Sequence, residues 1–248
     1  MCSIKEKQKD SFQITIDASA CTSLIEGAAC FGKNDGRDCW RYSSQQFESG
    51  KIYGLISEYE QGCMYLSYLL GGKVDFGDLK MSWNGNRIQR KDLECVSWNL
   101  EPACEPYRKS IVKKAVNAAI RKHKLDTTFA EIQERFCLTP EREDRRLFQL
   151  SGERWRASAA LGFAENKRIF YAPYNPSVFY YQMCQSALLK SLRELTDSGA
   201  LVLLPAGSDS FLKHIADECI YLDFDQHYEI EALRQRYQQY FGRGDWIR

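Results

Sequence analysis

Strands and helices alternate along the back third of this chain, and this alternation limits its fold more than any other feature. Ser151 is placed to cap a helix that runs to about Ala164, and Ser177 is placed to cap a long helix that ends at Ser198-Gly199. Strands separated by helices indicate a parallel sheet covered on both faces. The other elements predicted here are strands at 168–172, 200–204 and 219–222, a short helix at 211–216 and a terminal helix at 228–241.

The front and the middle of the chain have different patterns. The turn Asn84-Gly85-Asn86 after the strand Leu79–Trp83 indicates a small antiparallel hairpin. From Pro106 to Leu150 the sequence changes to helix, loop and charges of alternating sign, with a capping box at Thr128-Phe-Ala-Glu131. The expected fold class is therefore α/β, with an antiparallel β lobe and a helical insertion. Further strands are predicted at 12–16, 39–43, 51–57 and 94–98, and a basic helix at 107–123.

Composition argues against several classes of function. Lys and Arg number 34 against 33 Asp and Glu, a formal net charge of +1, so the chain lacks the basic excess typical of nucleic-acid-binding proteins. It also lacks an apolar run near the ~18 residues that a membrane span needs, and its first residues lack the apolar core of a signal peptide, so we expect a cytoplasmic protein. The 10 cysteines are scattered without a C-x-x-C pair, which predicts no metal site.

The stretch Leu55–Gly72 has the outline of a phosphate-binding loop. An apolar strand, a polar turn closing on Gly62 and an apolar helix follow one another, and α/β proteins bind ligands beyond the carboxyl ends of their parallel strands. The pattern G-x-x-x-x-G-K-[ST] holds phosphates with backbone amides and a lysine, and magnesium with a hydroxyl. Aligned on Gly62, the pattern has mismatched residues at its other defining positions, which are Ser57, Cys63 and Met64.

The charges of this turn are unfavourable as well. Glu58 and Glu60 put carboxylates where polyphosphate would lie, and like charges repel. Taken alone, the stretch favours an ordinary strand, turn and helix.

A second segment changes that interpretation. The run Leu150-Ser-Gly-Glu-Arg-Trp-Arg156 follows the helical insertion and opens a helix. LSGERWR resembles the signature of the ATP-binding cassette (ABC) family, which begins LSGG. The signature continues with a polar or acidic residue and an arginine, so Leu150, Ser151, Gly152 and Glu153 resemble it with one glycine missing. The resemblance implies one domain with a P-loop NTPase-like core. In it, residues 1–105 would hold the degenerate phosphate loop, 106–150 would form the helical subdomain, and 151–248 would form the signature helix and the rest of the core.

The resemblance also assigns roles to residues near other strand ends. Asn99 lies nearest to the family's glutamine loop. The run Lys167–Pro173 is similar to the family's strand that ends Asp-Glu-Pro. That alignment puts Tyr171 at the aspartate that holds magnesium and Ala172 at the glutamate that activates water. Neither residue can perform these roles.

The switch histidine of the family is also missing. Leu203-Leu-Pro-Ala-Gly-Ser-Asp209 resembles the strand that carries it, and the chain offers Gly207 or Ser208 at that position. None of the 3 histidines of the chain lies on this strand end. Magnesium ligand, water activator, phosphate lysine and switch histidine are therefore absent together, whereas the signature is largely kept.

The resemblance implies a function that fits this asymmetry. In the ABC family two cassettes pair head to tail, and each ATP lies between the phosphate loop of one and the signature helix of the other. We therefore expect a degenerate ATP-binding subunit of an ABC transporter, without catalytic residues of its own, that lends Ser151 and Gly152 to a competent partner. ATP and magnesium are expected only at that composite site, and neither on the isolated chain.

The expected partners are a second ABC ATP-binding subunit, in a heterodimer or alternatively a homodimer, and membrane permease subunits. They would hold the chain in the cytoplasm at the inner face of the cell membrane. Two other hypotheses stay open. In one, the chain is a pseudo-ATPase that acts as a scaffold or regulatory binding protein outside transport. In the other, ATP is trapped at the degenerate loop as a structural ligand.

Overall fold

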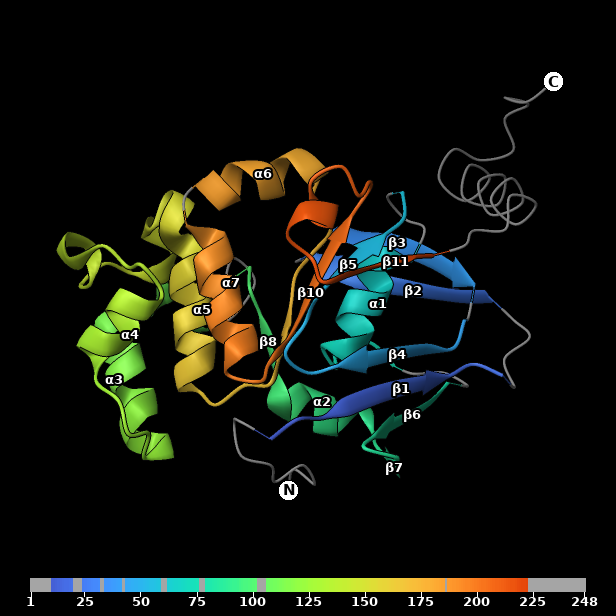
Figure 1. Cartoon of the computed structure of the whole chain (residues 1–248), viewed down its shortest axis with the longest axis horizontal. Coiled ribbons are helices and arrows are strands. Elements are labelled where there is room, and N and C mark those ends of the chain that lie inside the picture. The colour runs from blue at the N-terminus through green and yellow to red at the C-terminus, as the bar shows by residue number, and fades with distance from the viewer. Residues whose placement is uncertain are drawn as a thin grey trace.

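A five-stranded parallel sheet lies at the centre of the protein (Figure 1). The computed structural model describes residues 10–19, 24–31, 34–41, 43–58, 62–75, 79–101, 106–185 and 187–222. The strand order is β11-β5-β10-β9-β8, and the predicted parallel sheet is confirmed. The strands are β5 (Ile52–Ile56), β8 (Ser97–Asn99), β9 (Ile169–Tyr171), β10 (Leu201–Ala206) and β11 (Glu218–Tyr221).

Helices cover both faces of this sheet. Every residue of β5 and β10 is buried, as expected for parallel strands with apolar runs. Leu203 of β10 packs in one apolar cluster with helix α1 (Cys63–Leu70), whereas its neighbour Val202 packs in a second cluster with α5 (Arg154–Ala164) and α7 (Leu188–Asp197). Successive side chains of a strand point to opposite faces, so the two clusters are the two sides of the sheet.

An antiparallel lobe lies beside α1 (Figure 1). Its main sheet has the order β4-β1-β6-β7, and β2 and β3 form a separate hairpin next to α1. Ile14, Ile16 and Met81 of this lobe belong to the apolar cluster of α1. The hairpin predicted at Asn84-Gly85 is confirmed, because Trp83 pairs with Asn86 across it. The strands are β1 (Gln13–Asp17), β2 (Leu24–Phe31), β3 (Asn34–Arg41), β4 (Gln45–Glu48), β6 (Lys80–Trp83) and β7 (Asn86–Arg87).

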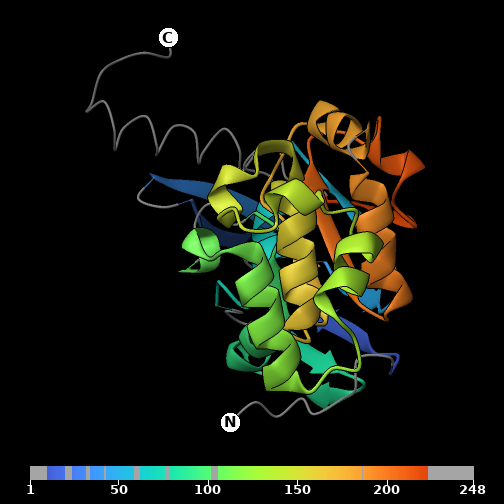
Figure 2. The same cartoon turned by 90° about the vertical axis from the view of Figure 1, so that its left-hand side faces the viewer.

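Helices gather at the other end of the molecule (Figures 1 and 2). Helix α3 (Val112–His123) packs on α5, and α4 (Phe129–Arg135) packs on α3. The predicted capping box is confirmed, since the Thr128 hydroxyl accepts the N–H of Glu131 at 3.3 Å and the Glu131 carboxylate accepts that of Thr128 at 2.7 Å. The connections contain α6 (Ser177–Gln185) and the short 3-10 helices η2 (Pro106–Lys109), η3 (Pro140–Arg142), η4 (Leu147–Gln149), η5 (Ser151–Glu153) and η6 (Leu212–His214).

The prediction of a strand at 94–98 is largely wrong. Helix α2 (Arg90–Val96) occupies most of that range, and β8 begins only at Ser97. The Asp92 carboxylate accepts the N–H of Gln89 at 2.9 Å, which closes the first turn of α2. A capping box between Gln89 and Asp92 therefore begins a helix in a range for which the residue pattern predicts a strand.

Other helices begin or break where the backbone turns left-handed. The long helix predicted from Ser177 is two helices, because Ala187 has φ 62° between α6 and α7. The helix predicted from Ser151 begins at Arg154 instead, and Ser151 lies in η5 with φ 41°. The terminal helix predicted at 228–241 lies outside the described residues.

Phe12 joins the antiparallel lobe to the parallel sheet. Its ring stacks on Trp83, with 4.0 Å between ring centroids and 9° between planes. The guanidinium carbon of Arg168, just before β9, lies 4.9 Å from the Phe12 centroid. Arg168 is buried and also donates a hydrogen bond to the Asp10 carbonyl. A buried cation over an aromatic ring is stabilising, so this contact holds the first residues of the lobe against the core.

Replacing Phe12 should therefore destabilise the whole domain. We expect Phe12→Ala to lower the free energy of unfolding by about 3 kcal/mol, because it leaves a cavity and removes both ring contacts. Urea unfolding followed by circular dichroism measures the loss. Phe148→Ala is the matched control, since Phe148 is 37% exposed and its removal should cost under about 0.5 kcal/mol. Equal effects for the two variants would contradict the prediction.

Candidate functional site

The candidate site residues follow neighbouring strands of the parallel sheet. Ser57 comes directly after β5, Gly207 after β10 and Ala172 after β9, and Asn99 ends β8. Because these strands are parallel and adjacent, their carboxyl ends meet at one edge, where α/β proteins bind ligands. The predicted loop, magnesium, switch and glutamine positions are thus brought to one edge of the sheet.

The first amide of helix α1 is occupied by the protein itself. The Ser57 hydroxyl accepts the N–H of Cys63 at 3.1 Å and donates to the Glu58 carbonyl at 3.0 Å. Gly62 precedes the helix with φ 108°, a conformation that other residues adopt only under strain. In a phosphate loop the amides at this point bind the anion. Here a hydroxyl lies at the Cys63 amide instead.

The side chains at the lysine and hydroxyl positions point into the protein. Cys63 and Met64 are each 1% exposed, and the Cys63 Sγ lies 3.7 Å from the Ser57 carbonyl oxygen. All eight residues of α1 are buried. Neither side chain is placed to meet a phosphate in solvent.

The predicted magnesium and water-activating positions are packed with apolar and aromatic groups. Tyr171 is 1% exposed, and its ring lies edge-on to Tyr68 of α1 at 5.4 Å between centroids. The Ala172 carbonyl accepts the Ser67 hydroxyl at 2.6 Å, which ties α1 to the end of β9. A Cβ on Gly71 would lie 2.8 Å from the Tyr171 ring, so the ring fills the space that this glycine leaves.

The switch position is covered by residues that sequence reasoning missed. A Cβ on Gly207 would lie 2.4 Å from the Tyr174 hydroxyl oxygen. The Ser177 hydroxyl lies 2.6 Å from the Ser208 carbonyl and 2.7 Å from its hydroxyl. Nearby, the Tyr180 hydroxyl donates to the Pro205 carbonyl at 2.9 Å, and complete burial raises the pKa of Tyr180 well above its usual value. A neutral phenol therefore occupies this part of the edge. The aromatic-rich run after β9 was the available sequence signal.

The signature-like segment, Leu150–Glu153, is partly exposed. Leu150 is 1% exposed and anchors it, whereas Ser151 and Gly152 face solvent. No atom lies within 4 Å of a Cβ built on Gly152, and its φ is not positive. The fold therefore has no steric need for a glycine there.

The amides of this segment are already bonded within the chain. The N–H of Gly152 donates to the Ser151 hydroxyl at 2.7 Å, and that of Glu153 donates to the Leu150 carbonyl at 2.9 Å. The Glu153 side chain is 3% exposed. It accepts the N–H of Thr139 at 2.7 Å and lies 3.7 Å from the guanidinium of Arg142. The Ser151 hydroxyl accepts the Gly152 N–H, and its residue is exposed to solvent.

Glu101 connects the glutamine-loop position with the signature helix, a link that sequence reasoning also missed. Its carboxylate accepts the indole N–H of Trp155 at 2.9 Å and lies 3.3 Å from Arg154. The N–H of Glu101 donates to the Asn99 side chain at 2.9 Å. The Asn99 carbonyl in turn accepts the hydroxyl of Ser158 in α5 at 3.2 Å. A shift at the end of β8 would thus reach α5 through several hydrogen bonds.

Neither a metal site nor a membrane-spanning helix is found among the described residues. No cluster of three or more His, Cys, Asp or Glu side chains there is arranged to hold a metal ion. No helix within those ranges is both long enough and apolar enough to cross a bilayer.

Comparison with solved structures identifies the fold. An ATP-binding cassette of an ABC transporter in its ADP conformation matches with a TM-score of 0.58 at 12% identity, over 86% of this chain and 87% of that chain. CbiO1 from Clostridium perfringens, part of the ABC transporter complex cbiONQ, matches with a TM-score of 0.57 at 10% identity, over 89% and 95%. A putative ABC transporter ATP-binding protein from Pyrococcus furiosus matches with a TM-score of 0.58 at 13% identity, over 85% and 97%.

Sequence comparison adds nothing to this result, since no protein-family model and no curated protein matches the chain. The structural matches cover most of both chains in each pair. The protein therefore has the fold of ABC ATP-binding cassettes, as the resemblance of LSGERWR implied.

The buried position of Cys63 predicts that restoring the lysine would harm the protein. Cys63→Lys places an ammonium group in a site that is 1% exposed, so we expect a loss of roughly 3 kcal/mol in unfolding free energy and no gain of ATP hydrolysis. Cys95→Lys is the control, because Cys95 is exposed and its replacement should be close to neutral. Thermal unfolding and a phosphate-release assay measure the two effects. A stable Cys63→Lys protein that binds ATP would show that the side chain can turn outward.

Proposed function

We propose that this protein is a degenerate, catalytically inactive ATP-binding subunit of an ABC transporter, which pairs with an ATPase-competent subunit. Its signature-like segment then completes the partner's ATP site. The observation that carries the proposal is a contrast between two segments. The Ser57 hydroxyl occupies the first amide of α1, and Cys63 and Met64 are buried, whereas Ser151 and Gly152 are exposed. A cassette in this state keeps only the outward half of a shared nucleotide site.

Catalytic inactivity follows from the groups at the sheet edge. Phosphoryl transfer needs a magnesium ion held against the phosphates and a residue that orients the attacking water. No carboxylate occurs between Asn166 and Ser177, and Tyr171 packs against Tyr68 at the magnesium position. ATP and magnesium are therefore assigned to the composite site with the partner.

The contribution of the signature-like segment rests on Ser151. The amides of Gly152 and Glu153 are bonded within the chain, so they are poor candidates for an anion. Ser151 has φ 41°, a left-handed conformation that glycine adopts more easily. Ser151 thus keeps a hydroxyl at a position that the backbone geometry does not favour, and Gly152 beside it has open space around it. Both features fit the close approach of a γ-phosphate bound by a partner.

The other proposed partners are inferred from the fold that this chain shares with known cassettes. CbiO1 is part of the transporter complex cbiONQ, and by this analogy the present chain would bind membrane permease subunits. Binding to such subunits would hold it at the inner face of the cell membrane. The network from Asn99 through Glu101 to α5 offers a route by which permease movement would reach the signature helix.

Substitutions of Ser151 test the shared site. In the complex with the partner subunit, Ser151→Arg should lower ATPase activity by on the order of 100-fold, because a bulky cation replaces the hydroxyl at the γ-phosphate. Ser43→Arg, a matched change at an exposed serine of the antiparallel lobe, should leave the rate unchanged. Unchanged activity with Ser151→Arg would refute the role of this segment.

Ser151→Gly separates function from stability. It relieves the strain of the left-handed backbone at this position. We therefore expect the free energy of unfolding of the isolated chain to stay the same or to rise by about 0.5 kcal/mol. The partner-dependent ATPase should nevertheless fall, because the hydroxyl is gone. Parallel urea unfolding and ATPase assays measure both quantities. A fall in both would point to a structural role alone.

The isolated chain should neither hydrolyse nor bind ATP. Millimolar Mg-ATP at 100 times a dissociation constant would stabilise a binding protein by ~2.7 kcal/mol, which thermal unfolding detects easily. We expect no shift, because Ser57 and the packed Tyr171 occupy the edge. A clear shift without hydrolysis would support ATP as a structural ligand at the degenerate loop.

A scaffold or regulatory binding protein is the second candidate. The observation that favours it is the inward turn of Glu153, which uses the signature position for contacts with Thr139 and Arg142. Purification of the chain under native conditions separates the two candidates. Co-purification with a permease and an intact cassette supports the transporter, and their absence supports the scaffold.

A further inference from the structure

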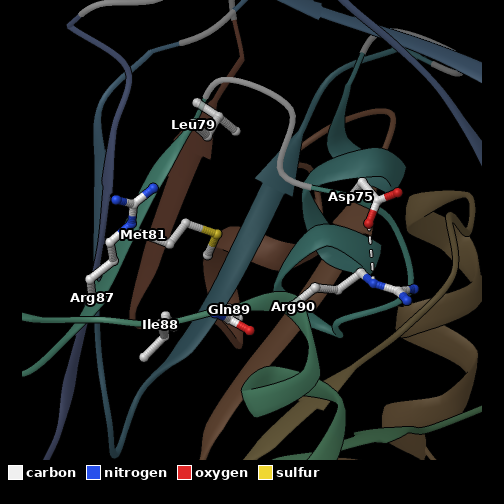
Figure 3. Close-up of a pocket in the computed structure, with 7 residues that line it drawn as sticks. All are labelled: Asp75, Leu79, Met81, Arg87, Ile88, Gln89 and Arg90. Atoms are coloured by element: carbon white, nitrogen blue, oxygen red, sulfur yellow. Dashed lines mark ion pairs between the residues drawn. The ribbon is translucent and has the colours of Figure 1, made fainter.

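A groove of about 770 Å³ lies between the β6–β7 hairpin and the start of α2, away from the candidate site. Figure 3 shows the residues that line it. Asp75, which follows the carboxyl end of α1, lines it, whereas the phosphate-loop position lies at the other end of that helix. The volume is within the range of small-molecule sites in proteins. The groove is therefore a surface separate from the candidate site, and a ligand could bind there without any nucleotide at the phosphate-loop position.

The floor of the groove is apolar. Leu79, Met81 and Ile88 line it, and the three residues are 5%, 2% and 6% exposed. All three belong to the apolar cluster that surrounds α1. Figure 3 shows Met81 pointing into the space between the hairpin and Arg90. An aliphatic group on this floor would be removed from water, which is favourable.

Among the described residues that line the groove, one positive charge on the rim has no acidic partner. Arg90 pairs with Asp75 through its Nε at 3.2 Å, as the dashed line in Figure 3 marks. Arg87 stands on the opposite side, on β7, and forms no ion pair with an acidic residue in the described part of the chain. The three charged side chains therefore sum to one positive charge.

We propose that this groove binds a small amphipathic carboxylate, with its anionic group on Arg87 and its aliphatic body on the apolar floor. A guanidinium offers two parallel N–H donors that match the two oxygens of a carboxylate. One net charge on the rim complements a monoanion, whereas a phosphate dianion would leave a charge unpaired next to Asp75. The protein as a whole has a net charge of only +1, so general attraction of anions would not produce such a preference.

The Met81 methyl group reports on the groove directly. The chain has 4 methionines, so NMR of the full chain with labelled methionine methyl groups gives few signals. The signal that disappears in the Met81→Leu variant is that of Met81. Titration with hexanoate should shift this signal saturably. Hexanamide has the same aliphatic chain without the negative charge, and acetate has the negative charge without the long aliphatic chain. We expect both to bind at least about tenfold more weakly than hexanoate.

Charge variants test the role of the rim. Arg87→Gln should weaken hexanoate binding at least about tenfold and leave hexanamide unchanged. Asp75→Asn frees Arg90 and should tighten hexanoate severalfold, and Asp75 is exposed enough, at 91% of its side chain, to be replaced without disturbing the fold. Lys80→Gln is the matched control, since Lys80 is an exposed cation of the neighbouring strand outside the groove.

The outcomes are separable. A hexanoate shift that Arg87→Gln removes and Lys80→Gln keeps supports the site. The proposal is overturned if Met81 does not respond, if hexanamide binds as tightly as hexanoate, or if Lys80→Gln weakens binding as much as Arg87→Gln. ATPase assays are not involved, so failure here leaves the proposed function intact.

Discussion

The burial of helix α1 is the constraint on which the rest of the structure depends. All eight of its residues are buried between the parallel sheet and the antiparallel lobe. A helix end inside a protein must satisfy its amides internally, and Ser57 does so for Cys63. Burial also disfavours charged side chains, which explains why Cys63 and Met64 fit where a phosphate loop would carry a lysine and a hydroxyl.

The same packing fixes the edge of the sheet around α1. Ser67 bonds the Ala172 carbonyl, and Tyr68 packs against Tyr171. The Tyr171 ring also requires that residue 71 lack a side chain, because a Cβ there would lie 2.8 Å away. The groups that face one another at this edge are therefore complementary without a ligand. By contrast, Ser151 and Gly152 bond to each other and are exposed to solvent.

The sequence predicts an element correctly where neighbouring residues determine it, as in a capping box, or where a whole strand is apolar. The apolar runs of β5 and β10 predict central parallel strands, and Thr128 to Glu131 predicts the start of α4. Such prediction fails where contacts distant in sequence decide the outcome. Glu101 meets Trp155 only once β8 and α5 are packed together, and Ser67 meets the Ala172 carbonyl only once α1 lies against the end of β9.

The mutual dependence of these contacts bears on the proposed inactivity of the chain. An aspartate at position 171 would be a carboxylate in a site that is 1% exposed, beside Tyr68 and without a lysine at position 63 to balance it. Each single reversion thus adds a buried charge without its partner, which is costly. Gly152 has the opposite status, because the fold would accept a side chain there. The fold therefore sets no requirement for a glycine at that point, which is compatible with the proposal that this exposed segment faces a partner subunit.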